Sequence, residues 1–172
     1  REHGRLDIAV NNAGIGGDSA LAGDYPTDTW RKVMSVNLDG VFYSMRYEIP
    51  AMLKNGGGSI INMGSVLSSV GIGQSGAYVA AKHGLVGLTK TAAIEYAKQG
   101  LRANAVCPGS IDTPMGQREL AAQPIMKGML EQTPAGRLGQ PDEIAAAIDF
   151  LLSDDASGIT GQVLAIDGGA SA

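Results

Sequence analysis

The chain has one cysteine, no cluster of basic residues and no long apolar run. Cys107 alone cannot form a disulfide within these 172 residues, and a lone thiol suits the reducing cytoplasm. A net charge of −4 argues against nucleic acid or an anionic membrane surface as a partner. No apolar run approaches the roughly 18 residues of a membrane span, and no His, Cys and carboxylate spacing is typical of a metal site. We therefore expect a cytoplasmic protein that binds no metal, nucleic acid or membrane.

The composition is that of a folded globular domain. Hydrophobic residues make up 44% of the chain and charged residues 17%, which is enough apolar material for a core. The length fits a single domain. The first residue is not methionine, and residues 1–7 resemble the charged end of a helix that runs into a strand. We expect residues 1–172 to be one domain that is truncated at its amino terminus.

Four short β-branched segments alternate with longer helical ones. This alternation predicts βαβ units, and hence an α/β fold with a parallel sheet and flanking helices. Ligands bind such sheets beyond the carboxyl ends of the strands. The expected strands are 6–11, 59–63, 102–106 and 162–166, the expected helices are 28–54, 77–99 and 141–152, residues 115–134 are expected to be irregular, and the loops expected to form a site are 12–17, 64–76 and 107–115.

The segment GIGQSG, residues 71–76, matches the dinucleotide-binding pattern G-x-G-x-x-G. In a true fingerprint the first glycine directly follows a strand, and an acidic residue ends the next strand about 20 positions on. Here several residues separate Met63 from Gly71, and Glu95 lies within a predicted helix. We therefore interpret these glycines as letting the chain approach a substrate pocket, and not as a phosphate cradle.

A tyrosine and a lysine share one helix face directly after that motif. Tyr78 and Lys82 are four residues apart, so their Cβ atoms lie about 5–6 Å apart. An ammonium near a phenol favours the phenolate and lowers the phenol pKa, which would make Tyr78 an acid/base near neutral pH. Ser65, at the end of the second strand, could hydrogen-bond the same substrate oxygen. Each residue also has a purely structural alternative. Tyr78 could be a surface tyrosine beside a solvated Lys82, and Ser65 could be a turn residue. Asn37, in the first long helix, could be a buried amide whose hydrogen bonds are satisfied within the protein.

These residues and their spacing resemble the short-chain dehydrogenase/reductase family, in the branch of 3-oxoacyl reductases and alcohol dehydrogenases. The motifs that carry the resemblance are Asn11-Asn12-Ala13-Gly14, Asn37, Gly64-Ser65, Tyr78-x-x-x-Lys82, Pro108-Gly109 and the segments PAGRLGQPDEIA and ITGQVLAIDGG. The family's opening strand and T-G-x-x-x-G-x-G turn are not found in these residues. The resemblance therefore implies the carboxy-terminal part of the doubly wound, Rossmann-like fold.

The resemblance implies a role for each matching residue. Tyr78 would be the general acid/base and Ser65 would bind the substrate oxygen. Lys82 would hold the nicotinamide ribose, and Asn37 would bind a water of the proton relay. The cofactor, NAD or NADP, would contact Asn12, Ala13, Gly14, Tyr78, Lys82, Pro108, Gly109, Ile111 and Thr113. The resemblance also implies a homo-oligomer, a dimer or a tetramer.

The loops expected to border the cleft contain apolar residues and no lysine or arginine. These apolar residues are Val66, Leu67, Val70, Ile72 and Met115. We expect a small, uncharged carbonyl or alcohol substrate for an NAD(P)-dependent oxidoreductase. The sequence leaves two other functions open. One is an isomerase or dehydratase on the same scaffold, and the other is an inactive fragment that serves as an assembly module.

The expected truncation predicts how residues 1–172 behave alone. Without the family's first strand, residues 6–11 would form an open sheet edge, which invites pairing with another chain. The contacts to adenosine and pyrophosphate would also be missing. We expect the 172 residues to bind NAD(P) weakly and to associate, as measured by calorimetric titration and light scattering. A monodisperse monomer with micromolar cofactor affinity would contradict this expectation.

Overall fold

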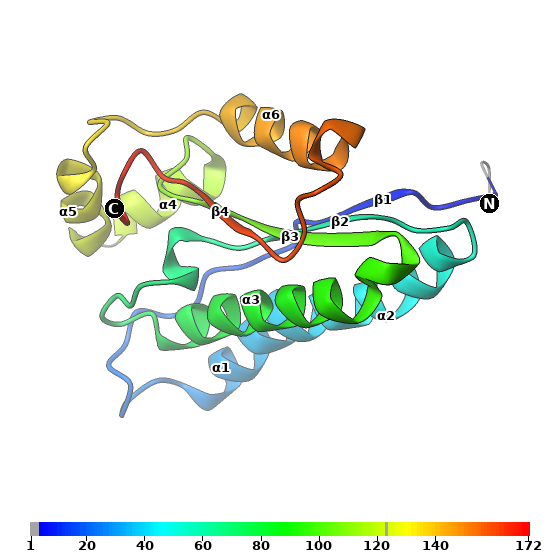
Figure 1. Cartoon of the computed structure of the whole chain (residues 1–172). Coiled ribbons are helices and arrows are strands. Elements are labelled where there is room, and N and C mark those ends of the chain that lie inside the picture. The colour runs from blue at the N-terminus through cyan, green and yellow to red at the C-terminus, as the bar shows by residue number, and fades with distance from the viewer. Residues whose placement is uncertain (1–3, 123) are drawn as a thin grey trace.

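A four-stranded parallel sheet forms the centre of the molecule (Figure 1). The computed structural model describes residues 4–122 and 124–172. The strand order follows the sequence, β1-β2-β3-β4, and the register pairs Asn11 with Asn62 and Met63 with Val106. The carboxyl ends of β1, β2 and β3 therefore meet at one end of the sheet, as predicted. The strands are β1 Ile8–Asn11, β2 Gly58–Met63, β3 Leu101–Pro108 and β4 Val163–Ile166.

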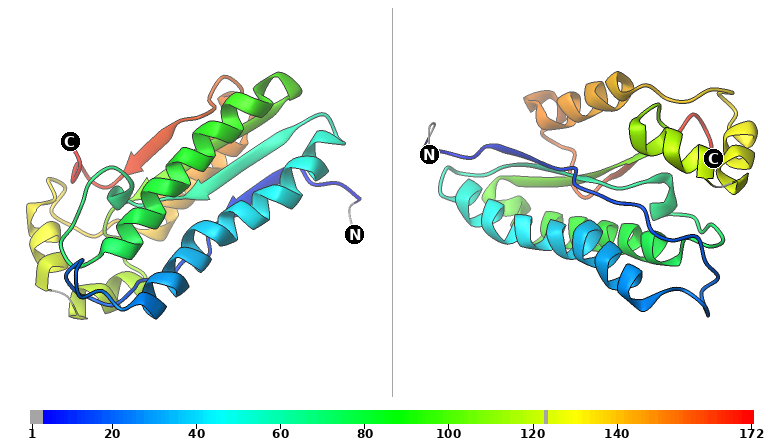
Figure 2. Two further views of the ribbon diagram at one scale, coloured as in Figure 1. Left: turned by 90° about the horizontal axis from the view of Figure 1, so that it is seen from below. Right: turned by 180° about the vertical axis from the view of Figure 1, so that it is seen from behind.

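Helices cover both faces of the sheet (Figures 1 and 2). The helices α1, α2 and α3 lie on one face, and α6 lies on the other. The α-helices here are α1 Thr27–Met34, α2 Gly40–Leu53, α3 Gly76–Tyr96 and α6 Pro141–Leu152. A π-helical turn, Ser35–Asp39, joins α1 to α2, and 3-10 turns occur at Val66–Ser68, Ala97–Gln99 and Asp154–Ala156. The predicted strands and long helices are thus confirmed, and the fold is the predicted Rossmann-like α/β arrangement.

The prediction that residues 115–134 are irregular is wrong. They form two helices, α4 Pro114–Ala122 and α5 Pro124–Gln132, which lie with the carboxyl terminus at one end of the molecule (Figure 1). Each helix opens with a proline. Proline breaks the interior of a helix but favours its first position, where its fixed φ fits and no N–H is needed. Pro114 and Pro124 therefore mark helix starts in this segment.

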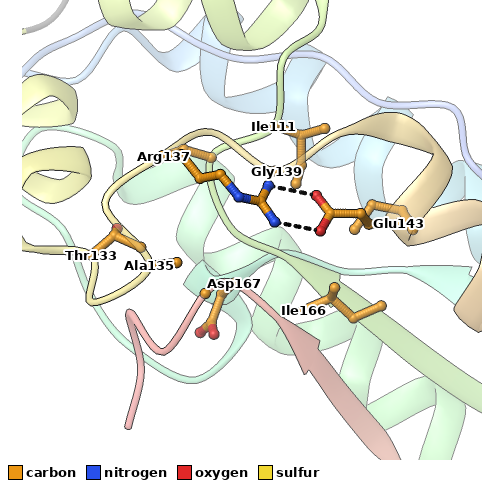
Figure 3. A pocket seen from close by; sticks show the side chains of 11 residues that line it. Ile111, Thr133, Ala135, Arg137, Gly139, Glu143, Ile166 and Asp167 are labelled. Atoms are coloured by element: carbon orange, nitrogen blue, oxygen red, sulfur yellow. Dashed lines mark hydrogen bonds and ion pairs between the residues drawn. The ribbon is translucent and has the colours of Figure 1, made fainter.

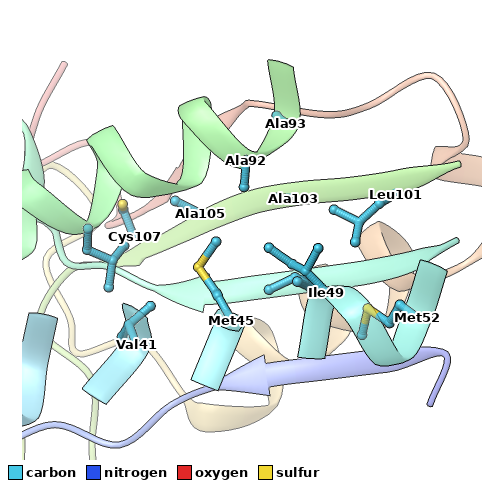
Figure 4. Close-up of a cluster of buried hydrophobic side chains, with 12 residues drawn as sticks. Val41, Met45, Ile49, Met52, Ala92, Ala93, Leu101, Ala103, Ala105 and Cys107 are labelled. Carbon is cyan, nitrogen blue, oxygen red and sulfur yellow. The ribbon is translucent and has the colours of Figure 1, made fainter. Parts of the chain in front are cut away.

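Two apolar clusters hold the layers together. Alternate residues of β2 point to opposite faces, so Ile60 packs toward α2 and α3 while Ile61 packs toward α6. Figure 4 shows the first cluster, in which alanines of α3 face alanines of β3. The first cluster comprises Val41, Met45, Ile49, Met52, Ile60, Leu85, Ala92, Ala93, Leu101, Ala103, Ala105 and Cys107. Cys107 is accordingly a small core residue in this structure.

The strand β1 lies at the edge of the sheet and presents apolar side chains to solvent. Ile8 is 53% exposed and Val10 is 42% exposed. The open edge matches the geometry expected for residues 6–11. On α2, the aromatic residues Phe42, Tyr43 and Tyr47 are exposed as well. Among the described residues, no helix combines the length and apolar character needed to cross a bilayer.

Candidate active site

A cleft of about 820 Å³ opens at the carboxyl ends of the strands. Segments that are distant in the sequence meet in it, because the parallel register brings the loops after β1, β2 and β3 to the same edge. The predicted site residues that line this cleft are Asn12, Ala13, Gly14, Ser65, Tyr78, Lys82, Pro108, Gly109, Ile111 and Thr113. Of the residues proposed from the sequence for catalysis or cofactor binding, Asn37 is the one that lies outside the lining.

The lysine of the predicted pair is buried, and it faces the tyrosine. Lys82 is 4% exposed, and its Nζ donates a hydrogen bond to the carbonyl oxygen of Met63 at 2.6 Å. The same Nζ lies 5.5 Å from the centroid of the Tyr78 ring. Burial lowers the pKa of Lys82 to about 8, and the nearby Cys107 opposes this shift. At neutral pH the cleft therefore holds an ammonium beside the tyrosine, and the alternative of a solvated lysine is wrong.

The serine at the end of β2 is oriented by a short turn. Ser65 Oγ accepts a hydrogen bond from the backbone N–H of Leu67 at 3.2 Å, and Ser68 Oγ accepts one from the N–H of Ser65 at 3.0 Å. These reciprocal bonds cap the 3-10 turn that follows. A hydroxyl that accepts one bond keeps its own hydrogen for donation. Ser65 therefore combines the turn role with a position in the lining of the cleft.

Asn37 is fully buried, and both polar atoms of its side-chain amide hydrogen-bond the backbone of Ile15. Its Oδ1 accepts from Ile15 N at 2.8 Å, and its Nδ2 donates to Ile15 O at 2.8 Å. The residue lies behind the cleft, because a Cβ placed on Gly14 would be 3.2 Å from Asn37 Oδ1 and 3.8 Å from Lys82 Nζ. The structure thus matches the satisfied-amide alternative. In this position Asn37 fixes the loop after β1, and its relay role stays a prediction.

The segment 71–76 that contains the glycine motif reaches the cleft at Ser75. Gly71 and Gly76 do not line it, and a Cβ added at either position would meet no atom within 4 Å. The chain thus approaches the cleft in this segment, but neither Gly71 nor Gly76 makes a close contact that a Cβ would prevent. Val70 and Ile72 also lie outside the lining.

Several residues of the cleft carry no sequence signal that could have found them. Asp18 and Tyr25 line one part of it, and Asp18 Oδ2 accepts a hydrogen bond from Thr29 Oγ1 at 2.5 Å. Leu120 of α4 and Met129 of α5 line it as well, together with Met115, which was expected. The two unexpected helices thus supply apolar wall. No group of three His, Cys, Asp or Glu side chains able to hold a metal occurs in the described parts of the chain.

Comparisons with known proteins place these features in context. A family model described as enoyl-(acyl carrier protein) reductase matches residues 1–171. The chain is 50% identical over 165 residues to the cyclohexanol dehydrogenase of an Acinetobacter species, covering 96% of this chain and 64% of that protein. It is 42% identical over 173 residues to the cis-4-hydroxycyclohexanecarboxylate dehydrogenase of Sinomonas cyclohexanicum, covering 99% of this chain and 68% of that protein. The chain thus spans about two thirds of the length of these relatives.

The fold also matches solved structures. A putative 2-deoxy-D-gluconate 3-dehydrogenase from Agrobacterium tumefaciens, solved with bound NADP, aligns with a TM-score of 0.90 at 39% sequence identity. The alignment covers 96% of this chain and 67% of that one.

The buried ammonium predicts a pH dependence of folding. The folded pKa of Lys82 is about 8 and the ordinary value is 10.5. Below pH 8 both states hold the proton, and the folded state bears the full cost of burying the charge. Between pH 8 and 10.5 the unfolded state binds more protons, so the free energy of unfolding rises with pH. Urea denaturation should show wild type gaining stability relative to Lys82→Met across this range.

A substitution on the same helix is the control for the loss of a positive charge. Lys90 is exposed, and Lys90→Met should not reproduce the divergence from wild type. Parallel stability–pH curves for wild type and Lys82→Met would contradict the burial of a charged lysine.

Proposed function

The chain belongs to the short-chain dehydrogenase/reductase family, and from this membership and the cleft we propose that it transfers hydride between NAD(P) and a secondary alcohol or ketone. Tyr78 is the proposed general acid/base. The observation that carries the proposal is the buried Lys82, whose Nζ lies 5.5 Å from the Tyr78 ring within the same cleft as Ser65. A buried ammonium beside a phenol is costly for stability, and such cost is typical of functional sites.

The proposed roles follow from charge and hydrogen bonding. When bound, the nicotinamide supplies or accepts the hydride. In the direction of oxidation, the ionised Tyr78 oxygen takes the hydroxyl proton of the alcohol while Ser65 donates a hydrogen bond to the same oxygen. The Lys82 ammonium stabilises the negative charge that Tyr78 carries before this transfer. In the direction of reduction, Tyr78 returns the proton to the carbonyl oxygen.

The residues at the strand ends fit the nicotinamide end of the cofactor. Lys82 has three N–H donors, and Met63 O uses one of them. The others are available to ribose hydroxyls, with the Asn12 amide lining the same cleft. Ile111 and Thr113, after β3, offer an apolar surface and a hydroxyl for a carboxamide-bearing ring. Nothing in this set separates NAD from NADP.

A substitution of the proposed acid/base tests the mechanism. Tyr78→Phe removes the proton-transferring group, so turnover of the active form of the protein should fall by at least roughly 10²-fold, with little change in substrate affinity. Steady-state kinetics with NAD(P)H and a ketone would measure both constants. Tyr47→Phe on the exposed side of α2 is the matched control. Near-normal turnover of Tyr78→Phe would refute the assignment.

We propose an uncharged alicyclic alcohol or ketone as the substrate. The cleft wall is mainly apolar, with Leu67, Met115 and Met129 among its residues, and its described lining contains no arginine. Among the described lining residues the cation is Lys82, which lies beside Tyr78, and the carboxylate is Asp18. Two relatives are named for alcohols on a cyclohexane ring, which supports the ring, and the relative that is 50% identical is named for the uncharged cyclohexanol.

The charge of the cleft predicts selectivity among ring alcohols. Cyclohexanol should be oxidised with a higher kcat/KM than 4-hydroxycyclohexanecarboxylate, because the carboxylate meets Asp18 and no partner cation. Asp18→Asn keeps an oxygen that can accept the hydrogen bond of Thr29. It should reduce the ratio of the two kcat/KM values by about tenfold or less, as expected for a solvent-exposed charge, and the reduction should be smaller at high salt. Asp24→Asn, exposed and outside the cleft lining, is the control. A preference for the carboxylate in wild type would contradict the proposed substrate class.

A further inference from the structure

An ion pair lies beside the large cleft, between the segment 137–140 and the start of α6. Figure 3 shows the Arg137 guanidinium paired with the Glu143 carboxylate through two parallel contacts, Nη1 to Oε2 at 2.8 Å and Nη2 to Oε1 at 2.7 Å. Glu143 Oε2 also accepts a hydrogen bond from the backbone N–H of Gln140 at 2.6 Å, and Arg137 Nη1 donates one to Leu138 O at 3.0 Å. The Arg137 hydrogen bonds, followed by that from Gln140, lower the pKa of Glu143 to about 2. Neither residue lines the large cleft.

These contacts fix the backbone on both sides of Gly139. The Arg137 side chain binds Leu138 before it, and Glu143 binds Gln140 after it. An exposed ion pair contributes little to global stability. A bidentate pair with two further backbone contacts restricts geometry, however, because the planar guanidinium admits few arrangements. The backbone of residues 138–140 is thereby restricted to one conformation.

Gly139 in turn holds the loop after β3. Its N–H donates to Ser110 O at 2.9 Å, and the N–H of Asp112 donates to Gly139 O at 2.9 Å, so that Ile111 and Gly139 form a parallel bridge. The approach is close, because a Cβ on Gly139 would lie 2.6 Å from Ile111 Cδ1. The bridged loop carries Ile111 and Thr113 into the large cleft.

The loop of residues 110–113 is not fully packed against the rest of the chain. A second cavity, of about 60 Å³, lies against it and is lined by Ser110, Ile111, Arg137, Gly139 and Glu143, among others (Figure 3). Atoms that border a cavity lack dispersion contacts on that side. The two backbone hydrogen bonds to Gly139 therefore matter more here than they would over a filled core.

We infer that Arg137 and Glu143 are positioning residues for cofactor binding: through Gly139 they hold residues 110–113 in the conformation that presents Ile111 and Thr113 to the nicotinamide. The cofactor part of this inference rests on the proposed function. The loop part does not, because it concerns contacts within the chain. The pair acts as a unit, so loss of either partner releases the loop.

Amide hydrogen exchange without cofactor tests the loop part directly. In Arg137→Met, the amides of Gly139 and Asp112 should exchange about tenfold faster, while the exchange rates of the β2 amides should not change. The reason is that the loop opens locally more often although the stability of the whole fold is unchanged. Arg5→Met removes a similarly exposed arginine–carboxylate pair, Arg5–Asp7, and is the matched control. Unchanged exchange at both amides, or the same acceleration in Arg5→Met, would overturn the proposal.

Cofactor affinity tests the remaining part. The dissociation constant of the active form of the protein for NADH or NADPH, whichever it binds, is measured by fluorescence. It should rise about tenfold in Arg137→Met and by less in Arg137→Lys, which keeps the positive charge but loses the bidentate hydrogen bonds. The double variant Arg137→Met, Glu143→Gln should be no weaker than the worse single variant, because the residues act together. Faster exchange with unchanged NADH affinity would overturn the cofactor role. Failure of the active form of the wild-type protein to bind either NADH or NADPH would instead refute the proposed function, and the exchange data would then decide the loop part alone.

Discussion

A buried ammonium at the carboxyl end of β2 is the constraint on which the cleft depends. Lys82 has lost its water, and its hydrogen bond to Met63 O at 2.6 Å offsets part of that loss. The amino-terminal part of α3 must therefore lie over the end of β2. That placement brings Tyr78, one turn earlier on α3, beside the ammonium and near Ser65, two residues beyond Met63. This hydrogen bond thus helps to set the position of the tyrosine relative to the strand ends.

The close approach of α3 to the sheet depends on small side chains and on one polar contact. Ala92 and Ala93 of α3 face Ala103 and Ala105 of β3 in the first core cluster, where larger side chains would push the helix away. The polar contact joins α3 to β2, because Asn62 Nδ2 donates to Thr89 Oγ1 at 2.9 Å. The same Asn62 joins β2 to β1, because its Oδ1 accepts from Asn11 Nδ2 at 2.9 Å. An unpaired amide in that core would cost about 1–3 kcal/mol, so these contacts favour a single register.

Local patterns predict the sheet, the long helices and most of the cleft, and tertiary contacts decide the rest. The parallel alternation alone indicates that the loops after Asn11, Met63 and Pro108 meet. The partners of Asn37 were not predictable, because an amide in an apolar helix face is equally compatible with a water, a ligand or a backbone unit as its partner. The pair Arg137 and Glu143 carries no periodic signal either, since its effect passes through a backbone bridge that only the folded chain forms.

The central claim is that this cleft carries out hydride transfer with proton transfer at Tyr78. The most direct measurement follows the hydride itself. Cyclohexanone is incubated with the active form of the protein and NAD(P)H that carries deuterium at the transferable C4 position, and the cyclohexanol formed is examined by mass spectrometry. The account predicts one deuterium on the carbinol carbon and none elsewhere. Cyclohexanol formed without deuterium from either face of the labelled cofactor, or no reduction of any ketone, would contradict it.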